Sequence, residues 1–274
     1  MRDVNDALLD QHRDVQQLAY RCAEEVAASL TPGITEKETT RRMRRWLAAS
    51  GVDDWFHLPF AWFGDRTAFR NFRRPLQFFP TDRRLAEGMP FILDVAPVVG
   101  PAIADIGFTS ALGGNEQLDG LLDHLARHRA LILDLVRARV TLREIYRRCD
   151  ELAADHGYDN RHREYPFGVI AHRVDPLPRI PVTTTVAGFG VRALVTLVRS
   201  GVVGRRRGWS PLWGAGSRSD HPPTPGLWAV EPHFGSGPIG AKFEELLVVT
   251  DDDAYWLDDD LPHVRRWAAR AVTA

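Results

Sequence analysis

The sequence is poor in cysteine and has no long apolar run. Its two cysteines, Cys22 and Cys149, lie on expected helix packing faces, so we interpret them as reduced core thiols and not as a disulfide. No apolar stretch approaches the roughly 20 residues that span a bilayer. The N-terminal segment lacks the basic and apolar regions of a signal peptide. We therefore expect a cytoplasmic protein with no membrane partner.

Neither sign of charge is in excess. Lys and Arg together number 35 against 36 Asp and Glu, which gives a formal net charge of −1. That balance argues against nucleic acid as a partner. Lysine is almost absent, because Lys37 and Lys242 are the only two. With 274 residues, 44% of them hydrophobic, the chain can bury a sizeable core, and we expect one domain over residues 1–274.

Two predicted helices share one construction. Thr35 and Thr141 are each followed by Glu three residues later, which is a capping box, and by a helix-ending Gly 16 residues later (51−35 and 157−141). The pair indicates an internal duplication with an offset of 106 residues (141−35). Two pseudo-equivalent α+β halves would then cover about residues 30–115 and 136–257. Other helices are expected over about residues 4–29 and 121–139.

Strand-like runs follow each of the two helices that begin at a capping box. They cover residues 57–63, 90–96, 182–186, 227–231 and 243–249. The stretch from about 191 to 225 is different, because it begins apolar and continues rich in arginine, tryptophan, glycine and proline. We interpret it as a long inserted loop, a feature that is typically functional or mobile.

Four carboxylates stand among apolar residues of these strands: Asp94, Asp105, Glu231 and Glu244. An unpaired buried charge is unfavourable, so positive charge is expected nearby. Buried arginine pairs or a divalent metal could supply it. Each acid alone is more typical of a strand end or a salt bridge. The four together, with a histidine near them, favour a metal cluster.

Several segments resemble the creatinase/methionine aminopeptidase/aminopeptidase P superfamily. The resemblance covers nearly the whole chain. Its most specific part is the pair of aspartate ligands, whose spacing here is 11 residues (105−94), together with the Glu-Pro turn and the final metal-binding strand. The matching segments are LTPGITEKETTRRMRRWLAASGV, LAEGMPFILDVAPVVGPAIADIGFT, VIAHRV, WAVEPHFG and GAKFEELLVVTDD.

The resemblance implies a fold and a metal centre. The fold would be the α+β pita-bread fold, a curved antiparallel sheet covered by helices in two pseudo-symmetric halves, present as the catalytic domain alone. Asp94 would chelate one metal with both oxygens, Asp105 and Glu244 would bridge two metals, and His172 and Glu231 would complete the second site. Oxygen ligands with one imidazole suit manganese, iron or cobalt more than zinc. Two such ions would share and activate a water.

The residues around the expected metals depart from the family. Ala171 replaces the glycine before the ligand histidine, and no histidine lies in segments 70–75 and 176–181, where peptidase members carry one. The arginine that follows the second aspartate motif is also missing. The metal ligands are thus kept, while the residues expected to transfer protons are replaced.

Four residues are candidates for the missing roles. We predict His221 and His233 as catalytic residues, and His57 and Arg207 as substrate-binding residues, with Arg207 suited to a substrate carboxylate. Each is also typical of a surface or structural position, and an arginine run is commonly a solvated face.

Three functions follow as alternatives. The first is a dinuclear-metal hydrolase of the aminopeptidase or Xaa-Pro peptidase type, acting on an amide bond of a peptide or small molecule. The second is a non-peptidase branch that acts on a small C–N substrate or as a lyase. The third is a non-catalytic binding protein that keeps the fold, against which four mutually repelling acids argue. The sequence leaves a homodimer open.

Overall fold

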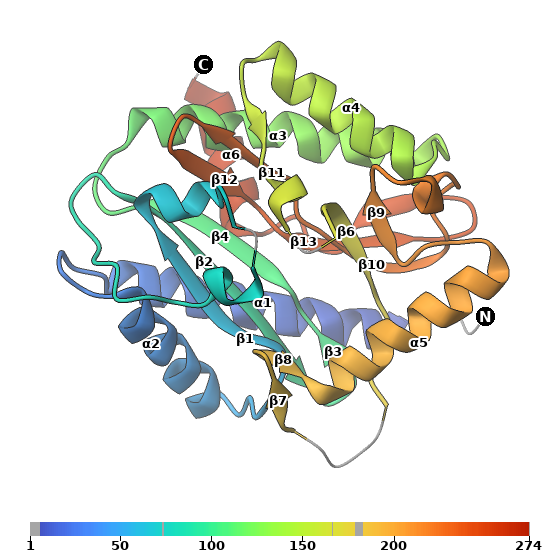
Figure 1. Ribbon diagram of the computed structural model, residues 1–274, viewed down its shortest axis with the longest axis horizontal. Helices are drawn as coiled ribbons and strands as arrows, with labels where there is room; N and C mark the ends of the chain where they lie inside the picture. The colour runs from blue at the N-terminus through green and yellow to red at the C-terminus, as the bar shows by residue number, and fades with distance from the viewer. Residues whose placement is uncertain (1–5, 73, 166, 179–182, 274) are drawn as a thin grey trace.

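The computed structural model describes residues 6–72, 74–165, 167–178 and 183–273 (Figure 1). Its helices are α1 Asp6–Ala28, α2 Glu36–Ala49, α3 Glu116–Arg137, α4 Leu142–Asp155, α5 Val191–Arg207 and α6 Pro262–Thr273. Its strands are β1 Asp54–Phe63, β2 Pro90–Val99, β3 Ala102–Ile103, β4 Ile106–Ala111, β5 Asp159–Asn160, β6 Val169–Val174, β7 Thr185–Val186, β8 Phe189–Gly190, β9 Leu212–Gly214, β10 Gly226–Val230, β11 His233–Ser236, β12 Ile239–Lys242, β13 Glu245–Val249 and β14 Ala254–Trp256. The 3₁₀ turns are η1 Gly64–Ala68, η2 Pro75–Phe78, η3 His162–Glu164 and η4 Ser217–Ser219.

The strands of the described residues form three antiparallel sheets. The first has the order β3-β2-β1-β8-β7, with β4 also paired to β2. The second has the order β14-β13-β10-β6-β9, and the third is β12-β11-β5. The predicted α+β class with antiparallel sheets and covering helices is therefore confirmed.

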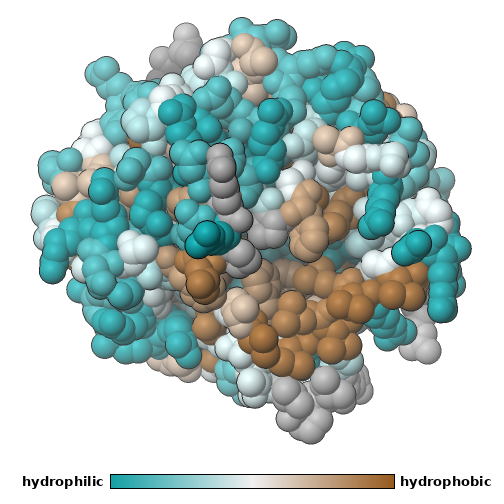
Figure 2. Space-filling view, in the orientation of Figure 1, coloured by the Kyte–Doolittle hydropathy of each residue, from teal (hydrophilic) through white to brown (hydrophobic). Residues whose placement is uncertain are grey.

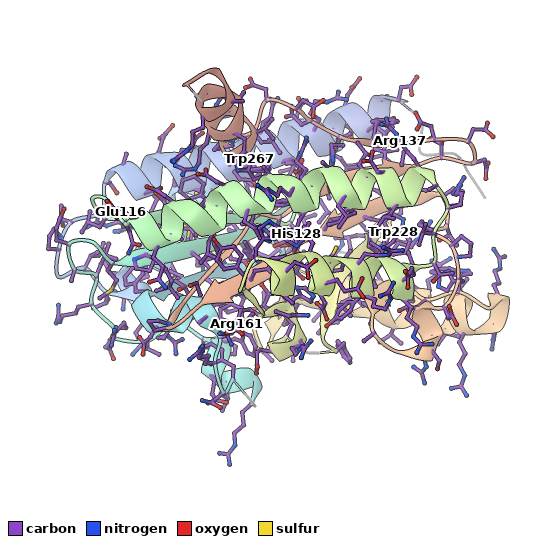
Figure 3. The ribbon with its side chains drawn as sticks, turned by 90° about the horizontal axis from the view of Figure 1, so that it is seen from above. Glu116, His128, Arg137, Arg161, Trp228 and Trp267 are labelled. Carbon is purple, nitrogen blue, oxygen red and sulfur yellow. The ribbon has the colours of Figure 1, made fainter. Side chains whose placement is uncertain are left out.

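Helices cover the outer faces of the sheets. Helices α1 and α2 pack on the first sheet, while α3 and α4 lie side by side over the strands of the second half (Figures 1 and 3). A separate core joins the inner faces of the first two sheets, for example Ala96 and Val98 with Ala229 and Leu246. The interior between the halves is therefore walled by strands from both.

Both predicted threonine N-caps are present, but each makes only one of the two hydrogen bonds of a capping box. Thr35 accepts a hydrogen bond from the Glu38 backbone N–H and Thr141 accepts one from Glu144. The reciprocal half of each capping box is missing, because both glutamates instead pair with arginines on their own helices. Helices α2 and α4 are each 14 residues long. The duplication stays a prediction that this equality supports.

Most predicted strands are present with shifted ends. The runs at 57–63, 90–96 and 227–231 lie in or overlap β1, β2 and β10, and the run at 243–249 contains β13. The run at 182–186 is mostly wrong: only Thr185–Val186 is strand, and Val182 lies outside the described residues. Both cysteines are buried and free, as expected.

The prediction of a long loop at 191–225 is wrong for about the first half of that segment, which is helix. Residues 191–207 form α5, and η4 and β9 follow it. Three valines on its outer side, Val195, Val198 and Val202, are at least 46% exposed. Figure 2 shows an apolar band across the lower right of this face, the region where Figure 1 places α5. In the described part of the chain, no helix combines the length and apolarity that crossing a membrane requires.

Candidate metal centre

The five predicted ligands lie together between the two halves. Asp94 is in β2, Asp105 lies just before β4, and His172 is in β6. Glu231 directly follows β10, and Glu244 lies between β12 and β13. Because side chains alternate along a strand, the neighbours of Asp94 in β2 face the α1–α2 core while Asp94 faces the interior.

Asp105 is contacted by two histidines. His172 Nε2 lies 3.1 Å from Asp105 Oδ2. His57, from β1, places its Nε2 3.0 Å from Asp105 Oδ1 and also 3.0 Å from Asp94 Oδ1. All four side chains are buried. His57 was expected to bind substrate, and the structure places it among the predicted metal ligands.

Lys242 stands at the centre of the remaining carboxylates. Its Nζ lies 2.6 Å from Asp94 Oδ2, 2.8 Å from Glu244 Oε2 and 3.1 Å from Glu231 Oε2. Gly107, opposite Asp94 in the β2–β4 ladder, makes room for it. A Cβ at Gly107 would lie 2.2 Å from Lys242 Cε, too close for any real contact. The lysine is thus fitted into the site by a neighbouring glycine.

Lys242 is a residue of the candidate site that the sequence analysis missed. Its signal was present in the sequence, because it is one of only two lysines and stands two residues before Glu244. A lysine beside a predicted buried carboxylate is expected to pair with it. Its contacts with Asp94 and Glu231 depend on the folded arrangement and have no local signal.

Burial and charge together set the protonation of this cluster. Burial lowers the pKa of Lys242, but Asp94 and Glu244 outweigh it and raise that pKa well above its ordinary value. Burial lowers the pKa of His57 as well, and Asp105 and Asp94 reverse the effect. Burial raises the pKa of Glu244, and the charges of Asp105 and Glu231 raise it further. The cluster therefore favours the charged forms of Lys242 and His57 and the protonated form of Glu244.

The donor set fits divalent metal ions. His57, Asp94 and Asp105 form one group of potential ligand atoms that lie within 4.8 Å of one another, and Asp105, His172 and Glu244 form a second. Asp94 Oδ1 is buried and has no hydrogen-bond partner among the described residues. An imidazole N–H can serve one oxygen, and that of His57 is directed to Asp105. A cation between these donors would satisfy the orphaned oxygen.

His233 lies one layer behind this cluster. It pairs with Lys242 in the β11–β12 ladder and is fully buried. Tyr165 Oη lies 3.1 Å from His233 Nδ1, and the Tyr165 ring lies 5.4 Å from Lys242 Nζ. Burial, reinforced by the charge of Lys242, lowers the pKa of His233 well below its ordinary value. The neutral His233 ring is thus linked to the carboxylate cluster indirectly, through Tyr165 and Lys242.

His221 is held in a different part of the fold. Its Nε2 accepts a hydrogen bond from the Ser210 backbone N–H, and its Nδ1 lies 2.8 Å from the Pro222 carbonyl. Its own carbonyl accepts from Leu142 at the start of α4. Both ring nitrogens therefore serve the loop around β9, and the structure does not bring His221 to the carboxylate cluster.

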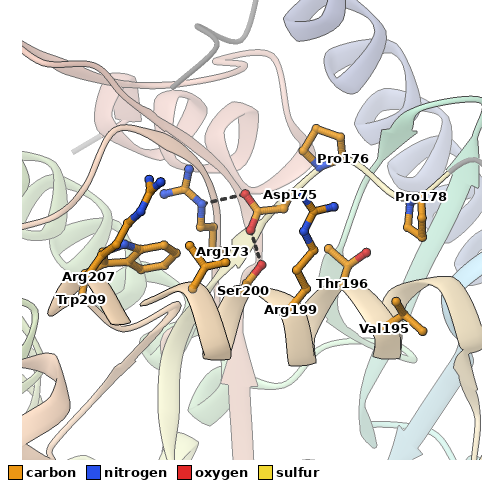
Figure 4. A pocket seen from close by; sticks show the side chains of 11 residues that line it. Arg173, Asp175, Pro176, Pro178, Val195, Thr196, Arg199, Ser200, Arg207 and Trp209 are labelled. Atoms are coloured by element: carbon orange, nitrogen blue, oxygen red, sulfur yellow. Dashed lines mark hydrogen bonds and ion pairs between the residues drawn. The ribbon is translucent and has the colours of Figure 1, made fainter. Parts of the chain in front are cut away.

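Arg207 lines a separate pocket of about 450 Å³ along α5 (Figure 4). The other charged side chains of this pocket are Arg173, Asp175 and Arg199. Arg173 is next to His172 in β6 and points to the other face of the strand, where it pairs with Asp175 and stacks on Trp209. Arg207 thus lies in a cavity, but one separated from the cluster by the β6 strand.

Comparison with known proteins identifies relatives by sequence model and by structure. The model of metallopeptidase family M24 matches residues 10–251. A sequence search of curated proteins returned no match. The structure is similar to an X-Pro aminopeptidase from Thermotoga maritima, with a TM-score of 0.67, 15% identity, and coverage of 94% of this chain and 62% of that one.

Two further solved structures are similar to this chain, one from a longer chain and one from a chain of about the same length. A dipeptidase, PepE, from Mycobacterium ulcerans has a TM-score of 0.65 and 21% identity, over 96% of this chain and 61% of that one. A methionine aminopeptidase from Rickettsia prowazekii has a TM-score of 0.64 and 13% identity, over 94% of this chain and 99% of that one. The chain thus spans about three fifths of the X-Pro aminopeptidase and dipeptidase chains.

The fold is the pita-bread fold, as the sequence predicted. The chain belongs to metallopeptidase family M24. The family implies divalent metal ions, and the buried donor groups described above are the candidate ligands.

Proposed function

We propose that this protein is a dinuclear-metal hydrolase that cleaves an amide bond of a peptide or small molecule. The observation that carries the proposal is the convergence of three buried carboxylates, the partly buried Glu231 and two buried imidazoles in an M24 chain. We assign as ligands Asp94, Asp105, His172, Glu231 and Glu244. Manganese, iron or cobalt suits this largely oxygen ligation better than zinc.

Bound metal ions would supply an activated water and a positive charge for the developing oxyanion. The chain's own part is to hold the reacting groups and to exclude bulk water. Lys242 fixes one oxygen each of Asp94, Glu231 and Glu244, so these carboxylates have defined orientations. His172 does the same for Asp105. Preorganised charges of this kind need no rearrangement during reaction.

We propose that Tyr165, positioned by His233, contributes to the substrate side of the centre. The hydrogen bond to His233 Nδ1 holds the Tyr165 hydroxyl, and the ring covers Lys242. His233 is thus a positioning residue in this account. We leave His221 out of the catalytic set, because its ring nitrogens are committed to the loop around β9.

An aromatic wall beside His57 would receive an apolar part of the substrate. Phe60 and Phe189 lie 5.2 and 5.9 Å from the His57 ring, and Phe79 lies 5.7 Å from Phe60. Phe189 and Phe79 are partly exposed. A hydrophobic side chain placed next to the scissile bond would bury its surface there.

A substrate screen with metal-loaded protein tests the proposal. Dipeptides, Xaa-Pro dipeptides and N-terminally free tripeptides are incubated with manganese-loaded wild type, and released amines are measured by mass spectrometry. We expect cleavage that is lost on chelation and in Asp105→Ala. Peptides with a large apolar residue should be preferred over their alanine counterparts.

The runner-up is a non-peptidase hydrolase or lyase of a small C–N substrate. Its support is the segment at 176–181, which lacks the histidine of peptidase members, together with Lys242 at the centre of the carboxylates. Full metal occupancy with no cleavage across the peptide panel would favour it. Two buried free thiols support a reducing, cytoplasmic location for either function.

A further inference from the structure

The nitrogen atoms of His57 point to a role in metal binding. Its Nδ1 lies 2.8 Å from the Leu58 carbonyl oxygen, which can only accept a hydrogen bond, so Nδ1 carries a proton. The other ring nitrogen, Nε2, faces oxygens of Asp94 and Asp105, each 3.0 Å away. A proton on Nε2 can serve only one of these two oxygens, whereas a metal ion in its place would bind all three atoms.

The spacing of these atoms suits one metal ion. Ligand atoms that lie about 2.1 Å from an ion and at right angles to one another are about 3.0 Å apart. His57 Nε2 has that separation from both Asp94 Oδ1 and Asp105 Oδ1. Asp94 Oδ1 also lacks a hydrogen-bond partner among the described residues. The three atoms therefore have the arrangement of one face of a coordination sphere.

His57 and His172 occupy corresponding positions. Each lies on a strand that comes after a helix with a threonine cap: β1 is the next strand after α2, and β6 follows α4 with β5 and η3 between them. Each directs Nδ1 to the carbonyl of the next residue and Nε2 to one oxygen of Asp105. A ligating histidine commonly donates its other ring N–H to a backbone carbonyl. We therefore expect His57 to have the same role as His172, that of a metal ligand.

The ion pair between Lys242 and Asp94 leaves a metal ion bound to Asp94 in need of a further ligand. Its Nζ lies 2.6 Å from Asp94 Oδ2, the oxygen that would make Asp94 a two-oxygen ligand. Only Oδ1 of Asp94 is then directed to the His57 side of the cluster. The coordination position that Oδ2 would fill is left for another donor, and His57 Nε2 is at hand.

We propose that His57 is a metal ligand, with Asp94 Oδ1 and Asp105, and takes the place of the second oxygen of Asp94. The inference rests on the dinuclear centre proposed above. It assigns one imidazole to each metal: His57 to the first and His172 to the second. It also removes His57 from the substrate-binding residues that the sequence predicted.

X-ray absorption of the cobalt-loaded protein tests the assignment directly. Wild type is loaded with Co²⁺, its stoichiometry is measured, and imidazole scattering is counted. We expect about one imidazole per cobalt in wild type, and about half as many in His57→Ala at a Co²⁺ concentration that fills both of its sites. Calorimetric titration should show that one of two Co²⁺ sites in His57→Ala is weakened more than about 100-fold, beyond what loss of an outer hydrogen-bond partner causes.

Two matched variants make the outcome decisive. His57→Gln keeps a polar side chain without the imidazole and should reproduce the loss, while His221→Ala removes a histidine outside the cluster and should bind like wild type. Wild-type protein with half an imidazole per cobalt, or variants at His57 with both sites at full affinity, would overturn the assignment alone. Wild type that binds no Co²⁺ would overturn the dinuclear function as well.

Discussion

At the scale of single residues, Gly107 and Lys242 depend on each other. The lysine side chain runs over the glycine, and a Cβ there would overlap Lys242 Cε at 2.2 Å. Thr109 supports the same lysine, because its hydroxyl donates to the Lys242 carbonyl at 2.7 Å. The missing side chain at Gly107 and the buried cation at Lys242 therefore form one structural unit.

Gly107→Ala should displace the Lys242 ammonium from Asp94 and Glu244. We expect the metal-free protein to lose about 1–3 kcal/mol in its free energy of unfolding, measured in urea, because an added methyl in a packed site forces side chains to move. Gly114→Ala is the matched control, since a Cβ there meets nothing within 4 Å. Equal stability of the two variants would show that Lys242 is not tightly held.

Glu36 is a second buried charge, away from the metal centre. Its carboxylate is fully buried and accepts from Arg66, from the Phe63 backbone N–H and from Thr81. Arg66 Nε lies 2.9 Å from Glu36 Oε1. The pair joins the start of α2 to η1 and to the segment before β2.

Glu36→Gln should destabilise the fold by about 3 kcal/mol, because it leaves the Arg66 charge without its buried partner. Chemical denaturation measures the change. Glu38→Gln, two residues along the same helix, removes a partly exposed partner of surface arginines and should lose less than about 1 kcal/mol. Similar losses for the two variants would contradict the importance given to burial.

At the scale of elements, α3 and α4 are joined by His128. It is fully buried, its Nε2 lies 3.1 Å from the Cys149 carbonyl on α4, and its ring lies 4.1 Å from Phe234. Burial lowers the pKa of His128 to about 3. The neutral ring is thus favoured in the folded protein, whereas the unfolded chain protonates it near its ordinary pKa.

His128 should make the fold sensitive to acid. Because the folded pKa is depressed, the unfolded chain binds more protons below about pH 6.5, and stability falls as the pH falls through that window. We expect wild type to lose about 3 kcal/mol more than His128→Gln between pH 7.5 and 4.5, from urea unfolding at each pH. Parallel pH profiles for the two proteins would refute this assignment.

The elements also show what local sequence predicts well. Threonine caps and terminal glycines located α2 and α4, because those signals act within one helical turn. Helix α5 was missed, because valines and two internal glycines oppose helix formation. Gly204 is explained by packing, since a Cβ there would lie 2.6 Å from the Trp209 carbonyl oxygen.

At the scale of the whole molecule, the proposed metal centre is assembled from residues that are far apart in the sequence. The sequence predicted the carboxylates, since charged residues within apolar strands are conspicuous and match the family. It did not predict that His57 from β1 would reach Asp105, 48 residues away, or that Lys242 would reach Asp94, 148 residues away. Such contacts depend on strand register and on sheet packing, which local patterns do not encode.

The central claim is that these residues form a two-metal centre, and metal analysis of manganese-loaded protein tests it most directly. Wild type, Asp105→Ala and the exposed control Asp252→Ala are loaded, freed of excess ion and analysed by mass spectrometry. The account predicts about two ions per chain in wild type and in Asp252→Ala, and almost none at the pair in Asp105→Ala. Metal-free wild type, or a fully loaded Asp105→Ala, would contradict it.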